Sequence, residues 1–154
     1  MTETLTLLAF DYGRKRIGVA VGQTLTGTAT PLTTIAVNKK VPDWDAISRL
    51  LDQWKPSALV VGYPLNMDGT TQSMTHAAVR FMNQLRHRYR LPVYQEDERL
   101  SSYEAGYRIR KDSPDIDAVA AQAILETWLA GNHLSIENNA TIRRKNADTP
   151  DHDA

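Results

Sequence analysis

The sequence predicts a mixed α/β fold, in which one sheet contains antiparallel and parallel strands and helices cover its faces. Two observations lead to this prediction. Short apolar runs separated by turns come first, and apolar residues at helical spacing begin only after residue 43. Beyond that point helix-like and strand-like segments alternate, which is typical of parallel strands joined by crossover helices.

Three strand candidates open the chain, and a turn follows each of the first two. The first two are Leu5–Phe10 and Arg16–Val21, with the glycine-containing segment Asp11–Lys15 between them. The third, Thr28–Val37, is rich in threonine and β-branched residues, but Pro31 interrupts it and favours an edge strand or a bulge. We therefore expect the sheet to begin with antiparallel strands.

The remaining segments alternate between helix and strand. Apolar residues recur at helical spacing after Asp43, at Ile47, Leu50, Leu51 and Trp54. This helix must stop before Pro56. The later predicted segments are a strand at 58–61, a helix at 71–89, a strand at 92–95, a short helix at 101–110, and a helix at 117–130 ended by Gly131 and Asn132. Among common small folds, the ribonuclease H-like fold has this order, with its first strand central in a mixed five-stranded sheet flanked by helices.

Length and composition predict one soluble domain. The 154 residues are 42% hydrophobic and 23% charged, and no apolar run approaches the roughly 18 residues of a membrane span. The first residues lack the basic start of a signal peptide, so we expect a cytoplasmic protein that does not bind membranes. Apolar residues become scarce after Ile136. We therefore expect residues 1–136 to form the domain and residues 137–154 to be a disordered polar tail.

The residue types present restrict any metal site to hard cations. The chain has no cysteine, and its four histidines show no metal-ligand spacing, so oxygen atoms must hold a metal, which favours Mg²⁺ or Mn²⁺. The net charge of zero gives no sign of a polyanionic partner. Basic residues do cluster locally, however, as at Arg14, Lys15 and Arg16. Taken singly, each cluster is better explained as an ordinary solvated surface.

Acidic residues stand where predicted strands end and where the last helix begins. Asp11 ends the first strand, three acids from Glu96 to Glu98 follow a later strand, and Asp117 opens the final helix. Each position has a structural explanation as a turn residue, a solvated acid or a helix cap. Strand alternation predicts that Glu96 and Glu98 share one face. Carboxylates converging at one sheet edge would repel one another unless divalent cations lay between them, and two cations about 4 Å apart can catalyse phosphodiester hydrolysis.

The loop at 62–70 is a candidate phosphate site. It joins a buried strand to a helix and contains two glycines, Asn66 and Thr70. Backbone amides and hydroxyl groups before a helix can bind a phosphate of a nucleic-acid backbone. The P-loop pattern for nucleoside triphosphates is missing, and an ordinary turn that requires glycine explains the loop equally well.

Four segments together resemble the YqgF family, whose members are described as Holliday-junction resolvases and as pre-16S ribosomal RNA nucleases. They are Asp11–Ala20, Val60–Thr70, Asp97–Ser102 with Glu104 and Ala105, and Ile116–Ala121. Where the family usually has two threonines, this chain has Ser101 and Ser102, which keeps the hydroxyl groups. The stretch before Asp117 is short, and little of the family's basic segment is left there.

The resemblance implies a ribonuclease H-like fold with catalytic, metal-binding carboxylates at Asp11, Glu98 and Asp117. It implies cleavage at the 5′ end of precursor 16S rRNA. We expect substrate contacts from six residues: Arg14, Lys15, Arg16, Asn66, Thr70 and Arg99. Two alternatives stay open, a resolvase of branched DNA and an RNA-binding module without catalysis. Either a monomer or a weak homodimer is expected.

Overall fold

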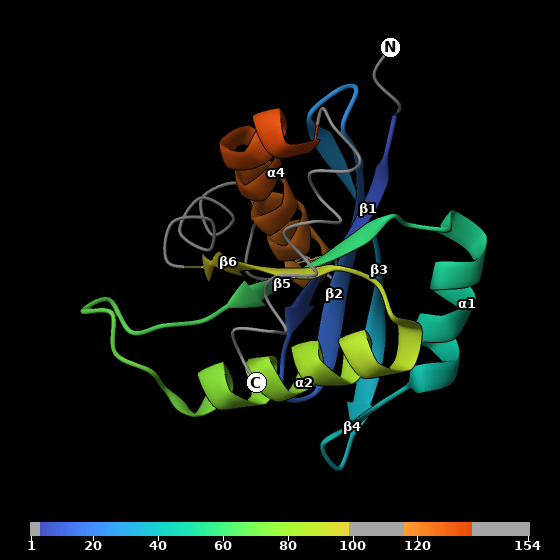
Figure 1. The fold of residues 1–154 in the computed structure, drawn as a ribbon. Helices are drawn as coiled ribbons and strands as arrows, with labels where there is room; N and C mark the ends of the chain where they lie inside the picture. Colours follow the sequence, from blue (N-terminus) through green and yellow to red (C-terminus); the bar gives the residue numbers. More distant parts are fainter. Residues whose placement is uncertain (1–3, 99–115, 137–154) are drawn as a thin grey trace.

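The computed structural model describes residues 4–98 and 116–136, which form a mixed sheet with helices on both faces (Figure 1). Within those ranges the sheet has six strands in the order β4-β3-β2-β1-β5-β6. The strands are β1 (Thr6–Tyr12), β2 (Arg16–Gln23), β3 (Thr28–Asn38), β4 (Val41–Pro42), β5 (Ala58–Tyr63) and β6 (Val93–Asp97). The helices are α1 (Trp44–Trp54), α2 (Ser73–Tyr89) and α4 (Ile116–Ile136).

Strand pairing confirms the predicted mixed sheet. β1 is central, antiparallel to β2 and parallel to β5, and β6 continues the parallel half. The register between β2 and β3 shifts where Ala20 pairs with Pro31, so the proline marks a bulge as expected. The sheet has one strand more than the five predicted. β4 is only two residues long and pairs only at the end of β3, so no hydrophobic period could announce it.

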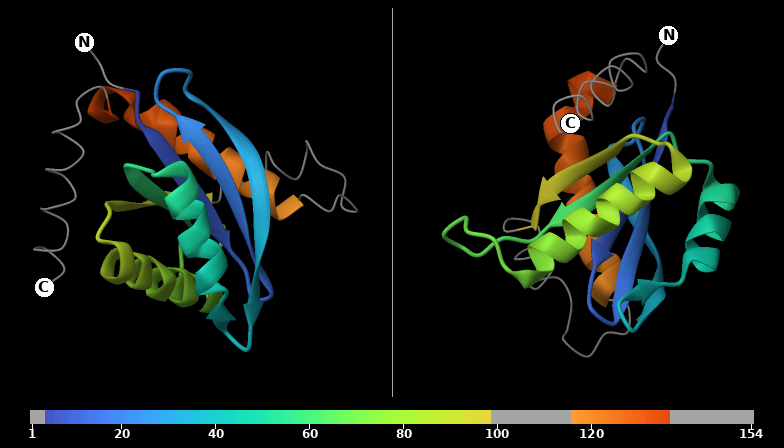
Figure 2. Two further views of the ribbon diagram at one scale, coloured as in Figure 1. Left: turned by 90° about the vertical axis from the view of Figure 1, so that its right-hand side faces the viewer. Right: turned by 60° about the horizontal axis from the view of Figure 1, so that its bottom comes forward.

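Two hydrophobic cores lie on opposite faces of the sheet. Alternate residues of β1 divide between them: Leu8 and Phe10 face α1 and α2, and Leu7 and Ala9 face α4. Figure 2 shows α1 and α2 on one side of the sheet and α4 on the other. Both faces of β5 are buried, as its unbroken apolar sequence predicts.

The boundaries of α1 and α2 follow from their caps. Asp43 caps α1 by accepting a hydrogen bond from the amide of Ala46 at 3.1 Å, and Lys55 ends the helix in the left-handed conformation. The helix α2 begins at Ser73, slightly later than predicted. Gln72 is its cap, and the hydroxyl of the buried Thr75 donates to the carbonyl oxygen of Pro64, which fixes the helix start to the preceding loop.

The helix α4 lies unusually close to the sheet because β2 presents glycines to it. A Cβ atom at Gly18 would lie 1.8 Å from the carbonyl oxygen of Asp117, and one at Gly22 would lie 2.7 Å from Leu125. On the helix side Ala118 and Ala121 are fully buried. The predicted end of this helix at Gly131 and Asn132 was wrong. The helix runs on to Ile136, and Gly131 lacks the positive φ of a helix-ending glycine.

Some predictions concern parts of the chain that the structure does not describe. The expected helix at 101–110 and the expected tail at 137–154 lie outside the described residues. In the described ranges, none of the helices has the length and apolar character needed to cross a membrane.

Candidate metal and nucleic-acid site

The parallel strands bring two of the predicted carboxylates to one edge of the sheet. Asp11 is the penultimate residue of β1, and Glu98 directly follows β6. Alternation along β1 places Asp11 on the face covered by α4, because Leu7 and Ala9 contribute to that core. Asp11 pairs with Gly18, the residue against which the start of α4 packs. The fold therefore directs Asp11 toward Asp117 as well as toward Glu98.

The charges of both Glu98 and Asp117 act on Asp11, which indicates that the three residues are neighbours. Burial, the charge of Glu98, a side-chain hydrogen bond with Glu98 and the charge of Asp117 together raise the pKa of Asp11 well above its usual value. Each cause disfavours the ionised carboxyl group. An ionised Asp11 thus needs a positive charge close by.

Among the three consecutive acids, Glu98 is the one that reaches Asp11. Its carboxylate lies against Gly62 of β5, where a Cβ atom would come within 2.5 Å of one carboxylate oxygen. A glycine at this position of β5 therefore makes room for the Glu98 side chain. Glu96 is partly buried, and burial together with the charge of Asp97 raises its pKa. Neither Glu96 nor Asp97 is among the groups that shift the pKa of Asp11.

Asp117 lies in the first turn of α4 and forms an ion pair with Arg16. The guanidinium Nε donates to Oδ2 of Asp117 at 2.5 Å, which joins the first residue of β2 to the helix. The arginine side chain is 59% exposed and the aspartate 27%, so the pair contributes little to stability. Its importance is positional, because it turns the Asp117 carboxylate toward the basic turn.

The ion pair also explains why no complete ligand set is assembled. Across the described residues, His, Asp and Glu side chains nowhere form a group of three with the spacing of a metal site. Asp11 and Glu98 are in contact, whereas the third carboxylate is occupied by Arg16. The oxygen atoms of Asp11 and Glu98 nevertheless fit the donor chemistry of Mg²⁺ or Mn²⁺.

An open cleft of about 480 Å³ lies beside the carboxylates. Glu98 and Asp117 line it together with the basic turn Arg14–Arg16. In this turn the amide of Gly13 donates to the carbonyl oxygen of Arg16 at 3.0 Å, which closes the hairpin between β1 and β2. A Cβ atom at Gly13 would lie 2.6 Å from that oxygen, so the turn requires glycine. All three basic side chains are exposed.

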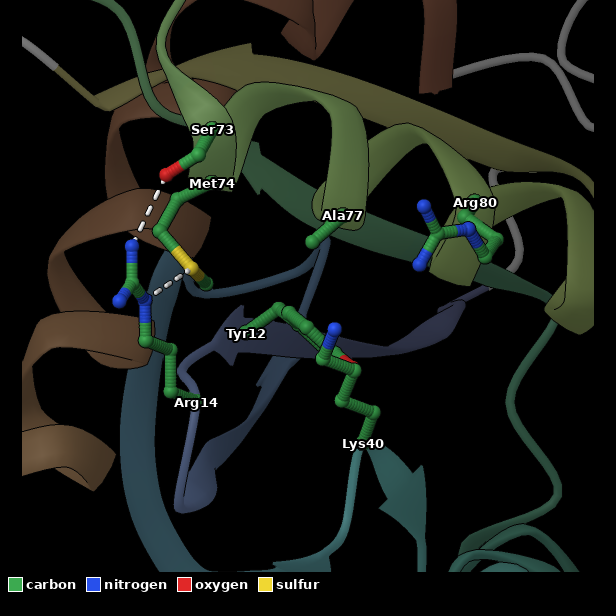
Figure 3. Close-up of a pocket in the computed structure, with 7 residues that line it drawn as sticks. All are labelled: Tyr12, Arg14, Lys40, Ser73, Met74, Ala77 and Arg80. Carbon is green, nitrogen blue, oxygen red and sulfur yellow. Dashed lines mark hydrogen bonds between the residues drawn. The ribbon is translucent and has the colours of Figure 1, made fainter.

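Arg14 is positioned by the start of α2. Its guanidinium donates to the hydroxyl of Ser73 at 2.9 Å and to the sulfur of Met74 at 3.4 Å (Figure 3). Both partners are neutral, so Arg14 keeps its full positive charge for an anion. The predicted turn cluster thus has two different roles, since Arg16 binds a carboxylate and Arg14 is held at the helix start.

The other predicted substrate residues lie elsewhere. Asn66 donates to the hydroxyl of Thr70 at 2.9 Å, and that hydroxyl in turn donates to Asp68 at 2.7 Å, so these side chains hold their own loop together. Neither Asn66 nor Thr70 lines the cleft. Arg99 lies outside the described residues. His76 and His87 are exposed.

Reasoning from the sequence missed several features of the site. Gly18 and Gly62 make room for Asp117 and Glu98, but a glycine in a strand does not show which partner approaches it. Tyr12 also lines the cleft, although no role was predicted for it from the sequence. Its position was a usable signal, because it is an aromatic residue beside a candidate ligand at a strand end.

Comparison with known proteins identifies the family. The profile of RuvX, described as "Holliday junction resolvase", matches residues 5–131. The chain belongs to the RuvX family. This confirms the resemblance to YqgF proteins, since both names denote one family. The RuvX match covers all four resemblance segments as well as Asp11, Glu98 and Asp117.

Relatives in the RuvX family share nearly half of their residues with this chain. One from Azotobacter vinelandii is 48% identical over 131 residues, covering 80% of this chain and 92% of the relative. One from Pseudomonas putida is 46% identical over 141 residues, covering 86% and 99%. Both are named "Putative pre-16S rRNA nuclease".

A solved structure confirms the expected ribonuclease H-like fold. Thermus thermophilus RuvC, determined in complex with a Holliday junction substrate, superimposes with a TM-score of 0.51 at 15% identity. The match covers 83% of this RuvX chain and 95% of the RuvC chain. At this identity the likeness concerns the fold alone.

Proposed function

We propose that this RuvX family member is a metal-dependent endonuclease that hydrolyses phosphodiester bonds in precursor 16S rRNA. The observation that carries the proposal is the environment of Asp11. Its carboxyl group contacts Glu98, is influenced by Asp117, and lies beside a cleft that contains an exposed basic turn. Clustered carboxylates next to cationic side chains are the pattern expected where a cation and a phosphate meet.

The proposed ligands are Asp11 and Glu98, joined by Asp117. The first two are already in contact, and burial together with the charges of Glu98 and Asp117 raises the pKa of Asp11. Arg16 holds Oδ2 of Asp117, so this oxygen becomes available when the ion pair opens. Divalent cations held by these oxygens would supply an activated water and would neutralise the charge that develops on the phosphate. The three acidic residues themselves provide the ligand oxygens, and their placement restricts the direction from which a phosphate enters.

The basic turn is the proposed phosphate contact. Arg14 and Lys15 are exposed in the cleft, and Arg14 is held by Ser73 and Met74. A substrate phosphate near Arg16 would also compete with Asp117 for that guanidinium. We therefore propose that substrate binding and release of Asp117 are coupled. Asn66, Thr70 and Arg99 remain proposed contacts with more distant parts of the substrate.

RNA is the favoured substrate, and branched DNA is the second candidate. Relatives that are 46% and 48% identical carry the name pre-16S rRNA nuclease, whereas the family description names Holliday junctions. Cutting a junction in two strands would require a symmetric dimer. For precursor rRNA, a monomer or a weak homodimer in the cytoplasm is sufficient.

A direct comparison of substrates tests this proposal. The purified protein is incubated with a precursor 16S 5′-leader RNA and with a four-way DNA junction, each with Mg²⁺, with Mn²⁺ or with chelator. We expect cleavage of the RNA that chelator abolishes. If only the junction is cleaved, the substrate is branched DNA. If neither substrate is cleaved, a non-catalytic RNA-binding module is favoured.

A further inference from the structure

A second cavity, of about 350 Å³, lies on the opposite side of β1 from the carboxylates. Tyr12 lines it from the end of β1, and Ser73, Met74 and Ala77 line it from α2 (Figure 3). This volume falls in the range of about 300–1,000 Å³ that is typical of small-molecule sites. It is large enough for a single nucleotide.

Three cationic side chains from three separate elements surround this cavity. Arg14 comes from the turn after β1, Lys40 from the turn between β3 and β4, and Arg80 from α2. None of the lining residues is acidic, and within the described ranges none of the three cations forms an ion pair with a carboxylate. Charges of one sign concentrated around a cavity attract an anion.

The turn that carries Lys40 is locally unfavourable. Lys39 and Lys40 both have positive φ values, 52° and 68°, in a hairpin position where asparagine and glycine are preferred. Lysine rarely adopts this conformation, so the surrounding structure must hold both lysines in it. Such departures from local preference occur more often at functional sites.

Tyr12 gives the cavity an aromatic wall. Its ring packs on Phe81 with the ring centroids 4.9 Å apart, so the core fixes the ring from behind. A fixed aromatic ring beside cationic groups is the combination that binds single-stranded nucleotides by stacking and phosphate contact.

The cavity adjoins the cleft that holds the carboxylates. Tyr12, Arg14 and Met74 line both of them. Asp11 and Tyr12 are consecutive and point to opposite faces of β1, so a strand of nucleic acid can cross the end of β1 from one cavity to the other.

Resting on the proposed nuclease function, we propose that this cavity binds one unpaired nucleotide next to the cleaved phosphodiester. The base stacks on Tyr12, and Arg14, Lys40 and Arg80 contact the phosphates on either side of the nucleotide. Paired bases in a duplex cannot enter the cavity. The site therefore selects single-stranded nucleic acid, and an unpaired leader of a precursor RNA fits this requirement.

Binding to a fluorescently labelled short oligouridylate tests the subsite, with calcium in place of magnesium to prevent cleavage. The double variant Lys40→Ala with Arg80→Ala should bind more weakly and lower the log–log salt slope by up to about 1.4, since each phosphate contact on a single strand contributes about 0.7. Tyr12→Leu should weaken binding roughly five- to hundredfold, and Tyr12→Phe should not. Arg49→Ala, at an exposed residue lining neither cavity, is the matched control.

The outcomes separate the subsite from the proposed function. Because Lys40 and Arg80 are exposed, their loss should leave folding intact. Unchanged affinity and slope in the double variant would overturn the subsite, even if the wild type cleaves RNA. If neither the wild type nor any variant cleaves RNA, but the double variant and Tyr12→Leu still lose affinity, the subsite stands and the nuclease function fails. The subsite would also be overturned if the wild type bound a duplex of the same length as tightly as the single strand.

Discussion

Asp11 lies with its carboxyl group toward Glu98 and Asp117, where a negative charge is costly in the absence of a cation. Its pKa is raised in the folded state above the usual value of 3.8, so the folded protein binds a proton more tightly than the unfolded chain. Stability from this group is therefore fully present below pH of about 4 and is lost as the pH rises through the raised pKa.

The variant Asp11→Asn cannot ionise at this position, so its stability should not fall with rising pH for this reason. In chelator, we expect the free energy of unfolding of the wild type to fall with rising pH above about 4, and that of the variant to fall less. At neutral pH the metal-free variant should be the more stable protein. Urea unfolding over a pH series measures this difference. A variant less stable than the wild type at neutral pH would show that Asp11 has a structural role instead.

Glu98 should matter more for cleavage than its neighbour Asp97. Of these two residues, Glu98 is the one that acts on Asp11, so Glu98→Gln should lose at least about a hundredfold in rate, which corresponds to about 2.7 kcal/mol of barrier. Asp97→Asn changes the same charge one residue away and serves as the matched control, with a loss of less than about tenfold. If Asp97→Asn is the more damaging change, the assignment of Glu98 is wrong.

Individual residues could be predicted where a local pattern or the family resemblance indicates them. Asp11 at a strand end and Asp117 at a helix start are visible in the sequence. The ion pair of Arg16 with Asp117 was not predictable, because it joins residues 101 positions apart and depends on the close approach of α4. Tyr12 lacked an assigned role because its cavity forms only when three distant elements meet.

The elements β2 and α4 position the site through the glycines of the strand. Gly18→Ala places a Cβ atom within 1.8 Å of the backbone at Asp117, and backbone cannot move aside cheaply. We expect a loss of stability of about 1–3 kcal/mol and a large loss of cleavage, since Asp117 is displaced. Thermal unfolding and cleavage rates measure the two effects.

Gly22→Ala is the matched control on the same strand. Its Cβ atom would meet mainly the flexible side chain of Leu125, next to the core and away from the carboxylates. Stability should fall less than for Gly18→Ala, and cleavage should be retained. Equal loss of cleavage in both variants would mean that the spacing between α4 and β2, and not the position of Asp117, controls activity.

The limits of element prediction follow from the same contacts. The start of α1 was predictable because Asp43 is a local cap. The end of α4 was not, since Gly131 has the sequence of a helix end but no positive φ. The role of the β2 glycines was not predictable either, because a glycine in a strand acquires this meaning only when a helix docks against it.

The whole molecule carries no net charge, so a polyanion must be held by local cationic groups. Lys15 is exposed in the cleft. Lys15→Ala should weaken RNA binding and lower the log–log salt slope by about 0.7, as expected for one contact with a single strand. Fluorescence anisotropy with calcium at several salt concentrations measures both quantities. An unchanged slope would show that Lys15 belongs to a solvated turn.

The architecture was predictable because hydrophobic periodicity identifies element types and crossover connections restrict their arrangement. The antiparallel start, the central β1 and the parallel β5 and β6 all followed from that order. The strand β4 did not, because two residues carry no period. The convergence of Asp11, Glu98 and Asp117 required both the sheet order and the docking of α4.

Cleavage of precursor 16S 5′-leader RNA by the wild type and by Asp11→Asn, at matched protein concentration with Mg²⁺, tests the central claim most directly. Asparagine preserves the shape of the side chain but removes the charge that holds a cation. We predict that the wild type cleaves the RNA, that chelator abolishes cleavage, and that the variant remains folded but is inactive. Cleavage by the variant within about tenfold of the wild type, a difference of only about 1.4 kcal/mol in barrier, would contradict a metal-binding role for Asp11.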